Sequence, residues 1–111
     1  MTDKRICLST CGSAEKAAAL ARELVGRRLA ACVNVIPQVR SFYRWEGEVQ
    51  DDPEHLLVIK TTAEGVDSLR AALLDLHSYD TPELVVLHIE DGSAAYLDWI
   101  GESVASRGDS R

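Results

Sequence analysis

The chain has 111 residues, of which 46% are hydrophobic and 27% charged, and its formal net charge at pH 7 is −6. This length suits one domain with a modest core, and the composition is typical of a globular protein. The acidic balance, without a cluster of Lys and Arg, argues against nucleic acid or an anionic membrane as a partner. No apolar run approaches the roughly 20 residues of a membrane-spanning helix, so we expect no membrane segment.

The three cysteines, Cys7, Cys11 and Cys32, are an odd set, and four of the first five residues are polar. Secreted proteins of this size usually carry an even set of paired cysteines behind an apolar leader. The sequence therefore predicts free thiols and a cytoplasmic location.

The first half of the chain alternates strand and helix patterns. Residues 5–10 alternate apolar and polar side chains, as in a half-buried strand. Ser13 can cap a following amphipathic helix that ends near Arg28. A long β-hairpin is then predicted from Cys32 to Lys60, with its turn at residues 46–47. Two prolines inside its arms, at positions 37 and 53, predict that the hairpin is bent.

The second half begins with Thr61 and Glu64, which have capping-box spacing and predict a helix ending near His77. A loop at 78–82, a strand at 83–89 and a last amphipathic helix follow. The resulting order, β-α-β-β-α-β, predicts an α+β, ferredoxin-like fold with a long central hairpin and an extra C-terminal helix. We expect one domain at residues 1–104 and a flexible tail at 105–111.

Two features of this plan call for a partner. A hairpin arm of about 13 residues would reach roughly 40 Å, whereas a compact chain of this size spans about 35 Å. The strands at 56–59 and 84–89 carry apolar side chains on both faces, yet the two crossover helices of such a fold cover one face only. Oligomerisation is the favoured explanation, and a monomer closed by its third helix is the alternative.

Five stretches of the sequence carry distinctive motifs: LAACVNVIP at 29–37, SFYRWEG at 41–47, LVIKTT at 57–62, HSYDTPE at 77–83 and YLDW at 96–99. Together they resemble the CutA family of divalent-cation tolerance proteins. The resemblance implies a ferredoxin-like protomer in a homotrimer, with hairpin strands pairing across subunits. It also implies a role in tolerance to copper and other divalent metals, through binding or sensing rather than catalysis.

The resemblance also indicates where a metal would bind. Copper ligation in bacterial relatives is attributed to a Cys late in the first strand and a His-His pair after the second helix, positions that read Ser9, Leu76 and His77 here. His77 is therefore the candidate ligand for copper or another divalent metal, with Cys11 as a possible substitute thiol. The alternative is structural, because an imidazole can complement a helix C-terminus.

A mixed aromatic and charged set at strand ends and loops suits a pocket between subunits. Its members are Tyr43, Trp45, Lys60, Tyr79 and Glu83. Interface packing is an equally good explanation of the same residues. A second functional class is a regulatory module like the trimeric PII proteins, which bind a small ligand at subunit clefts. No nucleophile–base constellation is recognisable, so we expect no enzyme.

Overall fold

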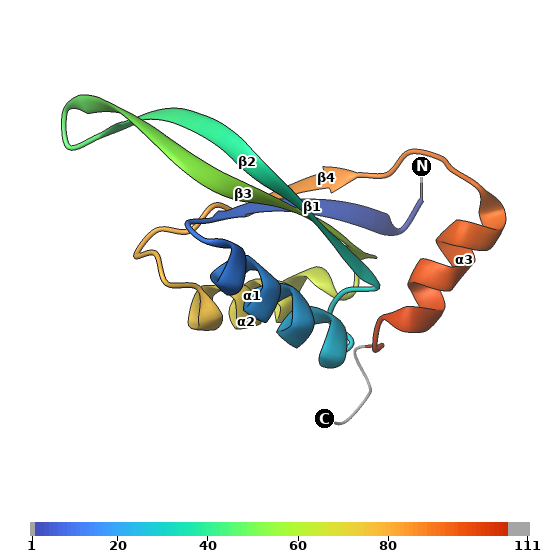
Figure 1. Cartoon of the computed structure of the whole chain (residues 1–111). Helices are drawn as coiled ribbons and strands as arrows, with labels where there is room; N and C mark the ends of the chain where they lie inside the picture. The colour runs from blue at the N-terminus through green and yellow to red at the C-terminus, as the bar shows by residue number, and fades with distance from the viewer. Residues whose placement is uncertain (1, 107–111) are drawn as a thin grey trace.

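The computed structural model describes residues 2–106. Within this range the elements are β1 (Lys4–Cys11), α1 (Ala14–Gly26), β2 (Cys32–Trp45), β3 (Glu48–Thr62), α2 (Val66–Leu76), β4 (Val85–His88) and α3 (Ala94–Ser103). The strands form one antiparallel sheet in the order β2-β3-β1-β4 (Figure 1). β3 is thus inserted between β1 and β2. The predicted ferredoxin-like α+β fold, with its long hairpin and extra C-terminal helix, is confirmed.

Helix α1 begins as predicted and ends slightly early. The Oγ of Ser13 accepts a hydrogen bond of 3.2 Å from the N–H of Lys16, which caps the helix. The helix ends before Arg28 because this residue adopts a φ of 60°, in the left-handed region. The Arg28 guanidinium donates to the carbonyls of Glu102 (3.0 Å) and Ser103 (3.3 Å). This contact joins the turn after α1 to the end of α3.

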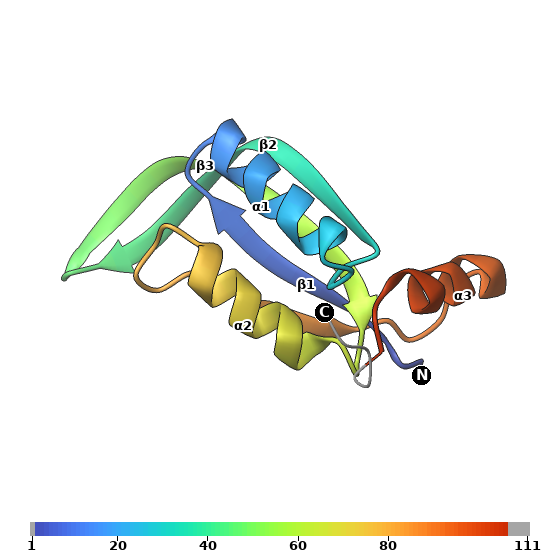
Figure 2. The same cartoon turned by 90° about the horizontal axis from the view of Figure 1, so that it is seen from below.

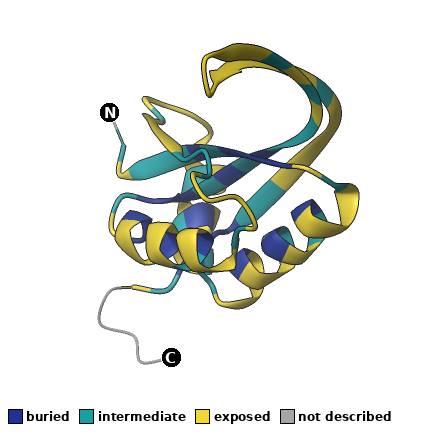
Figure 3. Ribbon diagram, turned by 90° about the vertical axis from the view of Figure 1, so that its left-hand side faces the viewer, coloured by how far each residue is buried: buried dark blue, intermediate teal, exposed yellow. Residues whose placement is uncertain are grey.

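The hairpin turns where the sequence predicts. Glu46 and Gly47 have φ values of 52° and 82°, the signs of a type I′ turn, whose twist matches that of the flanking strands. The β2–β3 register shifts at Pro37 and Gln38, and Gln38 has a φ of 62°. A bulge of this kind bends a strand pair, and the arm arches away from the rest of the sheet (Figure 3).

The predicted capping box at Thr61 and Glu64 is wrong. Thr61 is a fully buried residue of β3, and its hydroxyl donates to the carbonyl of Leu29 at 2.8 Å. Helix α2 instead starts after Gly65, whose N–H donates to the Oγ1 of Thr62 at 3.0 Å. The last strand is also shorter than the predicted 83–89, because only Val85–His88 pair with β1.

The sheet has one covered face and one open face. Helices α1 and α2 lie side by side across one face (Figure 2). The core beneath them combines sheet residues with helix residues, namely Cys7, Leu57 and Ile59 with Leu20, Leu24, Leu69 and Leu73. On the other face, Ile36, Val85 and Leu87 are each 45% exposed. The predicted apolar character of both faces is confirmed.

Helix α3 packs at the end of the sheet (Figure 1), where Ile100 and Val104 bury against Ala31. It therefore does not close the open face. The single chain measures 43 × 30 × 22 Å. Residues 107–111 of the predicted flexible tail lie outside the described range. No helix in residues 2–106 has the length and apolarity that crossing a membrane requires.

Candidate functional site

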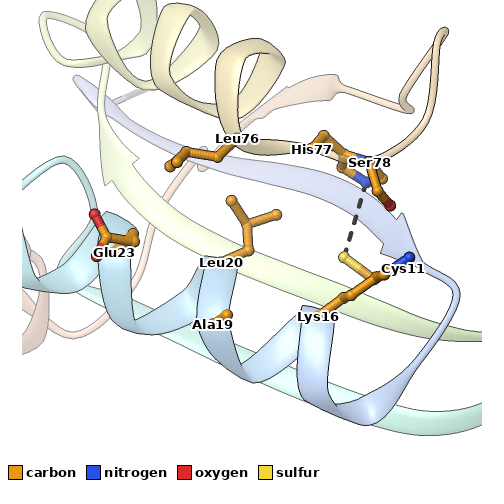
Figure 4. A pocket seen from close by; sticks show the side chains of 8 residues that line it. All are labelled: Cys11, Lys16, Ala19, Leu20, Glu23, Leu76, His77 and Ser78. Carbon is orange, nitrogen blue, oxygen red and sulfur yellow. Dashed lines mark hydrogen bonds between the residues drawn. The ribbon is translucent and has the colours of Figure 1, made fainter.

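The structure brings the two candidate metal ligands together. Cys11 is the last residue of β1, points toward the helices and is 3% exposed. His77 follows α2 directly, and its N–H closes the helix on the carbonyl of Leu73 at 2.9 Å. The Cys11 Sγ lies 3.8 Å from the His77 Nε2 (Figure 4). Cys11 belongs to the strand, one residue beyond its predicted end.

Both ring nitrogens of His77 have a partner. The Tyr79 N–H donates to Nδ1 at 3.1 Å, and Nε2 lies 2.7 Å from the carbonyl oxygen of Thr10. A backbone N–H only donates and a carbonyl only accepts, so Nδ1 carries the lone pair and Nε2 the proton. We therefore assign His77 the neutral Nε2–H tautomer.

The thiol of Cys11 is held in its protonated form. Burial raises its pKa, and the negative charge of Glu54 raises it further against the opposing effect of Lys16. The thiolate is the form that binds metals. A thiol and an imidazole are donors that Cu(II) and Zn(II) select, so the donor chemistry fits such an ion. Coordination by both groups would require that the Cys11 thiol and the His77 Nε2 each lose a proton and that Nε2 leave the Thr10 carbonyl.

The remaining family positions supply no further donor of this kind. Ser9 is fully buried, and its Oγ has no hydrogen-bond partner among residues 2–106. Leu76 is apolar. Over the same described residues, no group of three or more His, Cys, Asp or Glu side chains is arranged to hold a metal ion. A cation at the Cys11–His77 pair would have to complete its coordination with water or a partner's side chain.

Cys11 and His77 open onto a pocket of about 250 Å³ between α1 and the end of α2 (Figure 4). Its lining consists of Cys11, Lys16, Ala19, Leu20, Glu23, Leu76, His77 and Ser78. Its surface is mainly apolar, and its lining includes two exposed charged side chains of opposite sign, Lys16 and Glu23. The pocket borders both the thiol and the imidazole.

The predicted inter-subunit pocket residues fall into separate groups within one protomer. Tyr79 donates its hydroxyl to Glu54 at 2.8 Å, and Tyr43 donates to Asp52. Trp45 lies at the hairpin turn and is 50% exposed. Tyr43 and Trp45 therefore lie on the hairpin, and Tyr79 lies in the loop after α2 and contacts the hairpin through Glu54.

The other two candidates lie elsewhere. Lys60 places its Nζ 5.6 Å from the ring centroid of Tyr96, which in turn lies 5.4 Å from the ring centroid of Trp99. Glu83 is half-buried in the loop before β4. The five residues therefore do not converge on one point in a single protomer.

Sequence reasoning missed two acidic residues of this region, Asp52 and Glu54. They are two residues apart on β3 and accept the two tyrosine hydroxyls. Their spacing on one strand face was a readable signal. The identity of their partners was not, because Tyr79 reaches Glu54 only through the fold of the loop.

Known proteins resemble this chain over most of its length. The family model of the CutA1 divalent ion tolerance protein matches residues 5–103. The chain is 45% identical over 100 residues to the divalent-cation tolerance protein CutA of Thermus thermophilus, covering 90% of this chain and 97% of that protein. It is 40% identical over 101 residues to the protein CutA of Homo sapiens, covering 91% of this chain and 56% of the human protein.

Solved structures give the same result for the fold. The Cut A1 divalent cation tolerance protein of Thermus thermophilus superposes with a TM-score of 0.90 at 44% identity, covering 92% of this chain and 99% of that one. The CutA of Xylella fastidiosa superposes with a TM-score of 0.91 at 36% identity, covering 94% and 100%. The chain therefore belongs to the CutA1 family of divalent ion tolerance proteins.

Proposed function

We propose that this chain acts as a homotrimer that binds or senses copper or another divalent cation and does not transform a substrate. The observation that carries the metal proposal is the 3.8 Å separation of the Cys11 Sγ and the His77 Nε2 at the edge of an accessible pocket. A metal held there would act as ligand or cargo. The chain's own contribution is a thiol and an imidazole positioned by the ends of β1 and α2.

The proposed assembly is supported by the open sheet face. Within residues 2–106, the side chains of Ile36, Val85 and Leu87 on this face remain 45% exposed, and α3 packs at the end of the sheet (Figure 1). Covering such a face with another copy removes apolar surface from water at about 25 cal/mol per Å². The number three rests on the family resemblance seen in the sequence.

The non-catalytic part of the proposal is supported by the state of the candidate pair. A nucleophilic thiol needs a lowered pKa and a base with a free lone pair. Burial raises the pKa of Cys11, and the Nε2 of His77 carries a proton. The pair is therefore not set up as a nucleophile and its base. The three free cysteines suit the reducing cytoplasm that we propose as its location.

A small-molecule ligand at subunit clefts is the second candidate function. It is favoured by the exposed Tyr96–Trp99 pair, beside which Lys60 presents a positive charge. Aromatic rings and a cation together suit a planar anionic ligand such as a nucleotide. Titration with Mg-ATP distinguishes this candidate from the metal-binding one.

The metal proposal is tested by calorimetric titration of the purified protein with Cu(II), Zn(II) and Mg-ATP. We expect Cu(II) or Zn(II) to bind, and His77→Ala and Cys11→Ser each to weaken binding at least about tenfold, as loss of a ligand does. His88→Ala, which removes an exposed imidazole from β4, serves as the matched control and should bind like the wild type. Wild-type affinity in His77→Ala would overturn the direct metal site.

A further inference from the structure

Tyr79 contacts the candidate site in three ways. Its backbone N–H donates to the His77 Nδ1 at 3.1 Å, and its ring lies 4.7 Å from the imidazole, centroid to centroid, at an interplanar angle of 49°. Its hydroxyl donates to the Glu54 Oε2 on β3 at 2.8 Å. The side chain thus links the loop after α2 to β3, and its residue contacts His77 through both the backbone N–H and the ring.

The hydrogen bond from the Tyr79 N–H determines which nitrogen of His77 a cation can reach. While the Tyr79 N–H occupies Nδ1, the proton must sit on Nε2, which is the nitrogen beside the Cys11 thiol and the Thr10 carbonyl. Metal ligation needs an unprotonated nitrogen. In this arrangement neither imidazole nitrogen offers a free lone pair.

We propose that Tyr79, anchored by Glu54, is a positioning residue that fixes the tautomer of His77. It keeps the Cys11–His77 pair closed, meaning that neither imidazole nitrogen can bind a cation until residues 77–79 move. Its consequence for metal affinity rests on the proposed function. Its consequence for the tautomer of His77 does not. Access of a cation to Cys11 and His77 then depends on the hydrogen bond between the Tyr79 hydroxyl and Glu54.

The anchor is well suited to this role. The Tyr79 hydroxyl donates to a carboxylate, and a charged acceptor makes a hydrogen bond stronger than a neutral one does. Gly12 leaves the space that the hydroxyl needs, because a Cβ at position 12 would lie 3.1 Å from the Tyr79 hydroxyl oxygen.

The chain supplies a matched control. Tyr43 donates its hydroxyl to Asp52 on the same arm, and it makes no contact with His77 among those found in residues 2–106. Tyr79→Phe and Tyr43→Phe therefore delete the same oxygen from neighbouring phenol–carboxylate pairs. A thermal melt of each variant first establishes that it is folded.

The test without metal uses ¹⁵N NMR of the His77 ring and hydrogen exchange of the Tyr79 amide. In the wild type we expect a single Nε2–H tautomer. Loss of one hydrogen bond, worth a few fold to about tenfold in an equilibrium, should shift the Tyr79→Phe tautomer ratio toward Nδ1–H and speed amide exchange by a similar factor. Tyr43→Phe should change neither. Unchanged tautomer and exchange in Tyr79→Phe would overturn the proposal.

The test with metal titrates the same variants with Cu(II) and Zn(II). An opened pair should bind about three- to tenfold more tightly in Tyr79→Phe than in the wild type, corresponding to one lost hydrogen bond. If His77 binds metal but Tyr79→Phe binds no more tightly, the closing role is wrong. If no variant binds metal while the NMR effects appear, the positioning role stands and the proposed metal function fails.

Should Tyr79→Phe melt early, Glu54→Gln replaces it, because the amide keeps the shape of the acceptor but lacks its charge. We expect the same directions of change at a smaller size. A Glu54→Gln protein with wild-type tautomer, exchange and affinity would again contradict the proposal.

Discussion

The two faces of the sheet are built from the same strands, yet one is covered and the other is not. Leu57 and Ile59 are fully buried beneath α1 and α2, whereas Val85 and Leu87, on the opposite side, are each 45% exposed. The apolar pattern of a strand shows which of its faces are stabilised by burial. It does not show what covers each face. The contrast locates the protomer core on one side and the proposed assembly surface on the other.

The largest expected effect comes from a charge on the open face. Leu87→Asp would place three carboxylates in the proposed trimer interface, and an unpaired buried charge costs several kcal/mol. Light scattering should show a mass near 12.2 kDa instead of three times that value, with the circular dichroism of the folded chain retained. Leu74→Asp, on an exposed position of α2, should keep the wild-type mass. A trimeric Leu87→Asp protein would place the interface elsewhere.

Truncation on the covered face should have the next largest effect. Leu57→Ala leaves a cavity under the helices and should lower the free energy of unfolding by about 2–5 kcal/mol. Leu74, which is 51% exposed, provides the comparison, since Leu74→Ala should change that energy by no more than about 0.5 kcal/mol. Urea unfolding at fixed protein concentration measures both. Equal costs would remove the distinction between core and surface.

A smaller effect is expected from the buried thiol on the covered face. Burial raises the pKa of Cys7 to about 11 from its ordinary value of 9.0. Above pH 9 the unfolded chain loses this proton while the folded chain keeps it, so stability falls with rising pH, by at most about 1.4 kcal/mol per unit up to pH 11. Below pH 9 the thiol contributes no pH dependence.

Urea unfolding between pH 8 and 11 measures that slope. Cys7→Ala should reduce it but not abolish it, because burial also raises the pKa of Cys11. Cys32→Ala should leave the slope in place, because Cys32 lies outside the buried core. An unchanged slope in Cys7→Ala would assign the alkaline loss of stability to other groups.

The sequence was most informative where the determining interactions are local. The Ser13 cap and the turn at Glu46 and Gly47 depend on neighbouring residues, and both were predicted correctly. The capping box at Thr61 failed because its hydroxyl has a distant partner, the carbonyl of Leu29. A local motif predicts local structure only when tertiary contacts do not compete for the same atoms.

The candidate site was predictable in its residue types but not in its hydrogen bonds. His77 and Cys11 could be named from the sequence, but their 3.8 Å separation required the fold. The tautomer of His77 depends on the Tyr79 N–H and the Thr10 carbonyl, which are backbone groups that no sequence pattern singles out. The role of His77 and Cys11 in metal binding stays a prediction.

The turn at Glu46 and Gly47 also bears on how the sheet comes together. The β2–β3 ladder closes a loop of two residues, whereas the β1–β4 ladder joins Arg5 to His88 across most of the chain. The entropy cost of closure grows with loop length, and isolated hairpins form in about 1–10 μs. We therefore expect the β2–β3 ladder to form early in folding and the β1–β4 ladder, with its much longer loop, to form later.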